Sequence, residues 1–432
     1  MKKILIVVLM LVFALSTAFI GIGCKQQAAE TTTAAEETTA EITAAAEETT
    51  AESGEKIKIT FLSHTYEPWN NKLQEQTNTF MELNPNIEVE YTYIEHKELY
   101  AKLVTAFEAG TSADVIGVYG PWMPQFISGG FLAEAPEDVI EDITTNTGKF
   151  ENDAVTFSGK IYGYIQHIGI QIPIVNEDFF KGLGETLPDT WSGLAMLQDK
   201  YNDRKDIRMV ALAPDSPAIV IHWSSVLKSL GGRVLNDDLK KAAFNSPEGI
   251  EATKLYMKMS TPDFPTYDAN SIFLLGKTGF AIDGPWAKTF YQESEYLKDK
   301  NYHSSIPPKE KERWVSAYVW DWVVSSQATP EKQRASWDFI KFLSNDENYL
   351  DLATTIGFAP FRNANKKSMA EDPWAKGFVE ALDYAFIYYD RINNWEEVEK
   401  LIGRELERAV AGEITAEEAL SNAEAAVNAI LE

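Results

Sequence analysis

The sequence predicts an α/β fold built on a mostly parallel β-sheet, and three observations support this fold class. Strand-like and helix-like segments alternate from residue 56 to residue 119, an order typical of parallel strands joined by helices. The last of these segments, residues 114–119, is a short apolar run, which indicates a strand buried on both faces. About 376 residues follow an amino-terminal low-complexity region, and this length is enough for two lobes with cores of their own.

The first two strands frame a helix. Residues 56–62 alternate apolar and polar side chains, as a half-buried strand does. Residues 68–83 are helical in pattern, and the helix is expected to stop just before Pro85, because proline disfavours a helical conformation in the residue before it. Residues 87–91 then form a second alternating segment. We therefore expect strand, helix and strand in this order.

A second helix is predicted over residues 100–109. Leu99, Leu103 and Phe107 recur at helical spacing and form one apolar face. Gly110 follows as the expected end of the helix, since glycine adopts the left-handed conformation that closes many helices. The apolar strand of residues 114–119 comes next.

Polar and aromatic residues follow two of these strands where the strands end. In parallel α/β sheets, ligands bind beyond the carboxyl ends of the strands. His64 and Glu67 follow the first strand, and Tyr119 and Trp122 follow the third. We expect these four side chains to face a ligand. His64 is expected to be a neutral hydrogen-bonding residue, because five scattered histidines give no metal-ligand spacing.

The amino terminus carries the features of an export signal in residues 1–23. Lys2 and Lys3 precede an apolar run, and small residues lead to Cys24. A single cysteine at this place resembles the lipobox of bacterial lipoproteins, although Gly21 stands where that motif usually has leucine. The resemblance implies lipidation of Cys24 and a membrane tether. A plain transmembrane anchor is the alternative, since the run is close to the length that spans a bilayer.

Residues 24–56 predict a disordered acidic tether. Ala, Glu and Thr dominate this segment and Ile42 is its one large apolar residue, so it cannot bury enough surface to offset the entropy of ordering. The working domain is therefore expected outside the cytoplasmic membrane, either at the cell surface or in a periplasm.

Composition excludes some classes of partner and of site. The formal net charge of −26 argues against nucleic acid and anionic lipid as partners. No cysteine follows Cys24, so the folded part has neither a disulfide nor a thiolate metal site, and no cofactor is expected. The sequence contains no Gly-x-Ser-x-Gly elbow, His-Glu-x-x-His site or phosphate-binding loop. A non-catalytic protein is therefore predicted.

Several short segments in a fixed order carry a resemblance to a known family. No single segment identifies the family by itself. Together they extend over essentially the whole folded part, at residues 159–163, 175–179, 187–191, 231–232, 245–249, 276–286, 357–360 and 412–420. This order resembles the extracellular solute-binding proteins (family 1) of sugar ABC importers, of which maltose-binding protein is a familiar member.

The resemblance implies the type II periplasmic-binding-protein fold, in which two α/β lobes enclose a ligand cleft. Lobe 1 is expected over residues 57–165 with about 287–350, and lobe 2 over 166–286 with about 360–432. Hinge strands are expected to cross between the lobes near residues 164–171, 283–286 and 357–360. Closure about such hinges is a two-state motion that ligand binding biases.

Three aromatic positions are implied as ligand-binding by the resemblance. Trp286 matches a tryptophan that stacks on sugar in maltose-binding protein, with a core position as the alternative. Trp223 lies where the family places aromatic residues on the cleft, although one helical turn of error would bury it. Trp395 lies near the place of another stacking tryptophan of that protein, and we expect Trp395 and the nearby Tyr388 to bind the ligand. Gln166 is placed on a hinge strand, where its amide could address hydroxyl groups.

Trp320-Asp321-Trp322 departs from the small residues that the family usually has here. On a strand the two tryptophans share one face and Asp321 takes the other. In one arrangement Trp320 meets a sugar ring and Asp321 accepts hydroxyl hydrogens. In the other, the strand is packed and Asp321 turns to solvent. The sequence alone does not decide between these two arrangements.

The leading interpretation is a monomeric carbohydrate-binding lipoprotein that delivers a mono- or oligosaccharide to the permease subunits of an ABC transporter. Eleven Trp, 18 Tyr and 22 Phe support this, because sugar sites pair flat aromatic faces with polar groups. The alternative is the same fold with a cationic or other non-sugar solute, which the acidic charge would suit. A secreted carbohydrate-active enzyme with two catalytic carboxylates is a further alternative.

Overall fold

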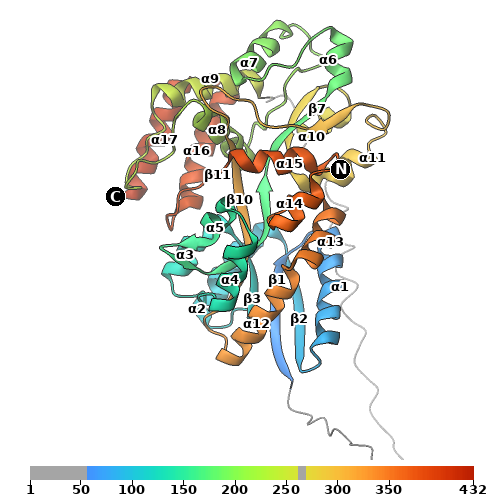
Figure 1. Cartoon of the computed structure of the whole chain (residues 1–432). Coiled ribbons are helices and arrows are strands. Elements are labelled where there is room, and N and C mark those ends of the chain that lie inside the picture. Colours follow the sequence, from blue (N-terminus) through green and yellow to red (C-terminus); the bar gives the residue numbers. More distant parts are fainter. Residues whose placement is uncertain (1–55, 261–268) are drawn as a thin grey trace, which may run out of the picture. The chain divides into compact units, whose positions relative to one another are not determined.

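The computed structural model describes residues 56–260 and 269–432 and is drawn in Figure 1. The predicted export signal, Cys24 and the tether up to residue 55 lie outside the described residues. In the part that is described, no helix has the length and apolar character needed to cross a bilayer.

One large mixed sheet and one small sheet organise the fold. The large sheet has the order β11-β10-β3-β1-β2, and β6 pairs with the other edge of β10. The small sheet has the order β8-β7-β9 and is antiparallel. The strands are β1 (Ile57–His64), β2 (Ile87–Ile94), β3 (Val115–Tyr119), β4 (Thr156–Phe157), β5 (Lys160–Ile161), β6 (Gly163–Ile170), β7 (Ile172–Asn176), β8 (Phe280–Asp283), β9 (Tyr302–Ser304), β10 (Val315–Val324) and β11 (Ala385–Ile387).

Helices surround both sheets. They are α1 (Glu67–Leu83), α2 (His96–Ala109), α3 (Met123–Ser128), α4 (Glu137–Asn146), α5 (Lys149–Val155), α6 (Glu177–Leu183), α7 (Trp191–Lys200), α8 (Ala218–Ser229), α9 (Pro247–Met259), α10 (Ala269–Leu274), α11 (Lys288–Glu293), α12 (Pro330–Leu343), α13 (Asp346–Ile356), α14 (Asn363–Met369), α15 (Ala375–Ala381), α16 (Trp395–Val410) and α17 (Ala416–Leu431). Short 3-10 turns include η1 (Gly120–Trp122), η3 (Pro285–Ala287) and η4 (Leu382–Tyr384).

The elements predicted for the first part of the chain are present. The strand β1 pairs in parallel with both β2 and β3, as the alternation of strands and helices predicted. The helix α1 ends at Leu83 before Pro85, and Gly110 closes α2 with a φ of 70°. Two features differ from the prediction. The helix α2 begins at His96, four residues before the expected start at residue 100, and β10 runs antiparallel to β3 and β6.

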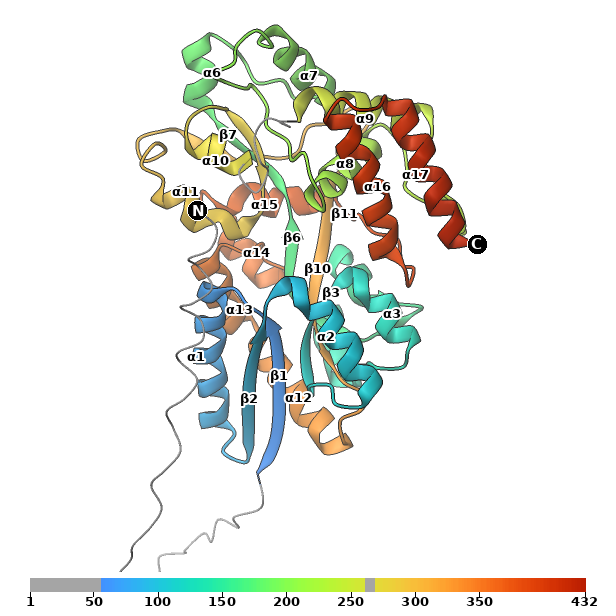
Figure 2. The same cartoon turned by 180° about the vertical axis from the view of Figure 1, so that it is seen from behind.

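The antiparallel strand β10 joins distant parts of the chain. Its first residues, Val315 to Ala317, pair with β11, and its last residues, Trp320 to Val324, pair with β3. Because β6 lies along the opposite edge of β10, this strand is buried in the middle of the sheet. Figures 1 and 2 show β10 and β6 running together from the large sheet toward the region of α8 and β7. Strand pairing between segments far apart in the sequence places β10 in the middle of this sheet.

Two helical layers cover β1 and β3. On one face, Phe61 of β1 packs against Phe339 of α12 with ring centroids 5.1 Å apart, and Phe339 meets Phe80 of α1 at 5.0 Å. The other face is covered by α2 and α3, whose buried residues share a cluster with Ile116 and Val118 of β3. Burial on both faces explains the continuous apolar run of β3.

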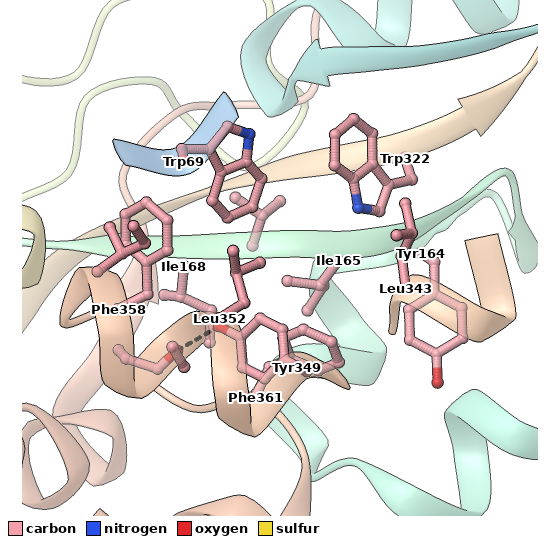
Figure 3. Close-up of a cluster of buried hydrophobic side chains, with 14 of the residues drawn as sticks. Trp69, Tyr164, Ile165, Ile168, Trp322, Leu343, Tyr349, Leu352, Phe358 and Phe361 are labelled. Atoms are coloured by element: carbon pink, nitrogen blue, oxygen red, sulfur yellow. Dashed lines mark hydrogen bonds between the residues drawn. The ribbon is translucent and has the colours of Figure 1, made fainter. Parts of the chain in front are cut away.

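Trp69 and Trp322 pack together where α1 meets β10. Their rings lie 6.1 Å apart and nearly parallel. Figure 3 shows both indoles beside β6, with Ile165 and Ile168 along that strand. Nearby, the hydroxyl of Tyr349 donates a hydrogen bond to the carbonyl oxygen of Ala359 at 2.7 Å. These contacts fix the central strands on which the site below is built.

The chain passes from the large to the small sheet between β6 and β7, where the resemblance indicated a crossing, and it returns between β9 and β10, where the resemblance indicated none. The strand β6 ends at Ile170 in the large sheet, and β7 begins at Ile172 in the small one. The strand β8 ends at Asp283, directly before η3, and Ala359 forms an isolated bridge with Ile168. The lobe boundaries and the hinge role of these segments stay predictions.

Candidate functional site

Aromatic side chains gather at the carboxyl ends of β1 and β3, where β10 passes beside them. Their rings contact one another across six segments of the chain. We call this group the aromatic cluster, and its members are His64, His96, Tyr119, Trp122, His167, Tyr318, Trp320 and Tyr388. The cluster lies where α/β sheets of this kind bind ligands.

Trp320 lies in the middle of the aromatic cluster. It is directly opposite Tyr119 in the antiparallel pairing of β10 with β3. Its ring centroid is 4.4 Å from that of His64, 5.4 Å from that of Tyr119 and 5.9 Å from that of Trp122. Only 4% of the Trp320 side chain is exposed. Trp320 therefore supports the more open rings around it rather than presenting a free face.

The solvent-facing members of the cluster are half-buried or exposed. Tyr119, Tyr318 and His64 are half-buried, and His96 is exposed at the start of α2. Burial, with a smaller contribution from His96, lowers the pKa of His64 to about 3, so this imidazole is neutral at physiological pH. In the described part of the chain, no group of three or more His, Cys, Asp or Glu side chains could hold a metal ion.

A chain of hydrogen bonds leads from the cluster into α16. The hydroxyls of Tyr119 and Tyr388 are 2.9 Å apart. The hydroxyl of Tyr388 also donates to the carboxyl of Glu399 at 2.7 Å. Burial raises the pKa of Glu399 to about 7, although the hydrogen bond from Tyr388 lowers it. The cluster thus ends on a titratable carboxyl.

Trp286 lies next to the aromatic cluster. It is half-buried in η3, directly after the small-sheet strand β8. Its ring centroid is 6.5 Å from that of Tyr318. The hydroxyl of Tyr66, two residues beyond β1, donates to the carbonyl oxygen of Trp286 at 3.4 Å. A segment that follows a strand of the large sheet and a segment that follows a strand of the small sheet therefore meet at this point.

The structure places four predicted residues apart from the open side of the cluster. Trp223 is fully buried in α8, where its indole nitrogen donates to the Thr253 hydroxyl at 3.0 Å. Trp395 is also fully buried, although its ring lies 6.0 Å from that of Tyr388. Glu67 is exposed at the first turn of α1. Gln166 is 1% exposed on β6, inside the sheet.

Asp321 fits neither arrangement considered from the sequence. It lies opposite Val118, so it faces away from Trp320 and Trp322 as a strand requires. Its side chain is fully buried rather than turned to solvent, and neither carboxyl oxygen has a hydrogen-bond partner among the described residues. Burial raises the pKa of Asp321 well above its usual value, and the charge of Arg391 opposes this rise. Burial therefore favours the neutral form of this carboxyl over the charged form.

Three residues that contribute to the site were not identified from the sequence. His96 follows the carboxyl end of β2, so the rule that selected His64 could have found it. Tyr318 precedes Trp320 by two residues and so shares its face of the strand. Glu399 gave no such signal, because only the packing of α16 brings its carboxyl to Tyr388.

A small cavity reaches the cluster from the side of α8. It has a volume of about 100 Å³, and its lining includes Ser224, Lys228, Tyr388 and Asp390. A second cavity of about 400 Å³ shares Lys228 with it and is also lined by Trp314. Tyr388 is the cluster residue that borders this space.

The chain resembles known binding proteins along most of its length. The family model described as bacterial extracellular solute-binding protein matches residues 75–377. The maltotriose-binding protein of Pyrococcus abyssi is 23% identical over 321 residues, which are 71% of this chain and 68% of that protein. The maltodextrin-binding protein MdxE of Bacillus subtilis is 25% identical over 255 residues, covering 54% of this chain and 58% of that protein.

Solved structures show the same fold. Maltose-bound MalE3 of T. maritima superposes with a TM-score of 0.74 at 24% identity, covering 87% of this chain and all of that chain. A tagatose-bound solute-binding protein from Thermotoga lettingae gives 0.74 at 22% identity with the same coverage. These are two-lobe periplasmic-binding-protein folds, as predicted. The matched family model covers well over half of the sequence, and the chain therefore belongs to the bacterial extracellular solute-binding proteins.

Proposed function

We propose that this protein captures a mono- or oligosaccharide between two lobes and delivers it to the permease of an ABC importer, without converting it chemically. The observation that carries the proposal is the aromatic cluster at the strand ends, with Trp286 beside it. Support also comes from the family and from the sugars named for its relatives.

The cluster offers what a sugar requires. A pyranose presents apolar C–H faces and a rim of hydroxyl groups, so its sites combine aromatic faces with a few polar atoms. The half-buried rings of Tyr119, Tyr318 and Trp286 supply such faces. The neutral imidazole of His64 and the phenol hydroxyls can donate and accept hydrogen bonds. No step of bond cleavage is needed for this role.

Transport follows from a shift between two conformations. A ligand that contacts residues of both sheets, such as Tyr119 and Trp286, stabilises the arrangement in which they are close. The permease would recognise that closed arrangement. The proposed tether at Cys24 would hold the protein outside the cytoplasmic membrane beside the permease. Metabolic labelling with a fatty acid, lost in Cys24→Ala, would support this anchor, and unlabelled protein would contradict it.

Calorimetric titration of the purified protein tests the binding function. We expect maltotriose or maltose to bind with micromolar or tighter affinity, and Trp286→Ala to weaken binding at least about tenfold, as the loss of a buried aromatic contact implies. The control is Trp314→Ala, a half-buried tryptophan outside the aromatic cluster, which should bind normally. Heat from choline alone, with no response to any saccharide, would favour a cationic solute. Chemical conversion of the bound sugar would contradict the proposal.

A further inference from the structure

The hydrogen bonds of Tyr119, Tyr388 and Glu399 form a chain that starts at the ligand side and ends in a buried carboxyl. Tyr119 is half-buried at the end of β3. Tyr388 is 2% exposed and Glu399 is 7% exposed. The two bonds measure 2.9 Å between the hydroxyls and 2.7 Å from Tyr388 to the carboxyl. The inner two members are thus shielded from water, and the outer one is partly exposed.

When Glu399 is ionised, the number of hydrogens that each group can donate fixes which group is the donor in each of these hydrogen bonds. A phenol has a single hydrogen to donate, and a carboxylate can only accept. Tyr388 donates its hydrogen to Glu399, so the hydrogen between the two hydroxyls must come from Tyr119. Tyr119 has then used its one donor inside the protein. Toward a ligand, its oxygen can only accept.

Protonation of the carboxyl permits the opposite direction. The carboxyl O–H can donate to the oxygen of Tyr388, Tyr388 can donate to Tyr119, and Tyr119 can then donate its own hydrogen outward. No heavy atom has to move, because each bond keeps its two partners and only the hydrogens change sides. We propose that Glu399 is a positioning residue which, through Tyr388, decides whether the Tyr119 hydroxyl offers the ligand an acceptor or a donor.

This inference rests on the proposed function, and the surroundings of Glu399 make the change accessible near neutral pH. Burial raises its pKa to about 7, with Glu396 adding to the rise and with Tyr388 and Lys400 opposing it. Lys400 is paired with Glu396 at 2.6 Å on the exposed side of α16. On α2, partial burial of the imidazole lowers the pKa of His96, and the charge of Glu396 opposes this shift.

The other elements around α16 do not alter this balance. α8, α9, α17 and η1 all contact α16. Among the described residues, none of them contributes an ionisable group that shifts the pKa of Glu399. Tyr119 is hydrogen-bonded to Tyr388, and the charge of Glu399 also raises the pKa of Tyr119 directly, after the larger effect of burial. The protonation of this carboxyl is therefore coupled to few groups besides the hydroxyl chain itself.

The test measures maltotriose affinity at pH 6 and pH 8 by calorimetry, in buffers of different ionisation enthalpy. For the wild-type protein we expect the dissociation constant to change about fivefold, the size of one hydrogen bond gained or lost, with net proton exchange on binding. Glu399→Gln keeps the side-chain shape but cannot titrate, so its dissociation constant should be the same at both pH values. The control Glu397→Gln, an exposed residue of the same helix, should keep the wild-type pH dependence.

Two further measurements guard against a folding defect and against failure of the proposed function. Tyr388→Phe breaks the chain without changing the charge at Glu399, and it should also abolish the pH dependence. In the ligand-free protein, the ring carbon signals of labelled Tyr119 should titrate near pH 7 in NMR spectra and should not titrate in Glu399→Gln. Wild-type binding that is equal at both pH values without proton exchange, or an unchanged slope in Glu399→Gln, would overturn the inference. Titration of Tyr119 without binding of any saccharide would overturn the proposed function alone.

Discussion

The hydroxyl of Tyr66 donates a hydrogen bond to the backbone carbonyl oxygen of Trp286 at 3.4 Å, across 220 positions of sequence. Tyr66 follows β1 of the large sheet, and Trp286 follows β8 of the small sheet. The bond is long, so its contribution is small. It nevertheless joins two segments that the proposed closing motion would bring together.

Removing this bond should weaken sugar binding slightly. Tyr66→Phe leaves the ring in place and deletes the donor. We expect maltotriose affinity to fall about two- to threefold, as the loss of one weak hydrogen bond implies. Tyr201→Phe is the matched control, because its hydroxyl bonds to Glu185 far from the cluster. Calorimetry compares the two, and an equal loss in both variants would contradict a role at the site.

Asp321→Asn should stabilise the protein at high pH. Burial holds the pKa of this carboxyl well above its usual value, so the folded chain keeps a proton that the unfolded chain releases above about pH 4. Wild-type stability therefore falls as pH rises from there toward the folded pKa. The Asp321→Asn variant does not lose stability in this way. The difference between its free energy of unfolding and that of the wild type should therefore grow by up to about 1.4 kcal/mol for each pH unit.

Calorimetric unfolding of both proteins at pH 5 and pH 8 measures this difference. Asp203→Asn changes an exposed residue and should leave the pH dependence as in the wild type. A constant difference between Asp321→Asn and the wild type at the two pH values would show that this carboxyl is not neutral in the folded protein.

Gly110→Ala should destabilise the protein by about 1 kcal/mol, because a Cβ atom is strained in the left-handed conformation. Gly110 has a φ of 70°, and no atom lies within 4 Å of a Cβ placed there. Strain is therefore the sole expected cost. Gly182→Ala is the control, since this glycine is exposed inside α6 with equally open surroundings. It should be neutral or stabilising in denaturant unfolding, and equal losses in both variants would contradict the argument.

Trp223→Phe should cost stability and leave sugar affinity unchanged. The indole is fully buried and donates to Thr253, so the variant loses a buried hydrogen bond and leaves a small void. We expect a loss of about 2 kcal/mol in denaturant unfolding. Maltotriose binding is then measured well below the unfolding transition. A large loss of affinity with intact stability would instead place Trp223 at the ligand.

The local elements were predictable because short-range chemistry sets them. Alternation identified β1 and β2, the apolar run identified β3, and Gly110 marked the end of α2. The spacing of residues along a strand also placed Asp321 on the face opposite Trp320. It could not show that this second face is covered by protein, since Tyr389 and Arg391, which interact electrostatically with Asp321, come from a distant part of the sequence.

The sequence by itself determined the family, the order of the first strands and helices, and the strand ends at which His64 and Tyr119 lie. Each of these depends on neighbours in the chain or on the order of short segments along it. Tertiary structure alone decided the rest. The pairing of β10 with β3 gathered Trp320 and Tyr119, the packing of α8 buried Trp223, and the docking of α16 brought Glu399 to Tyr388. Burial and partners are set by contacts between segments far apart in sequence, so the periodicity of any one segment cannot reveal them.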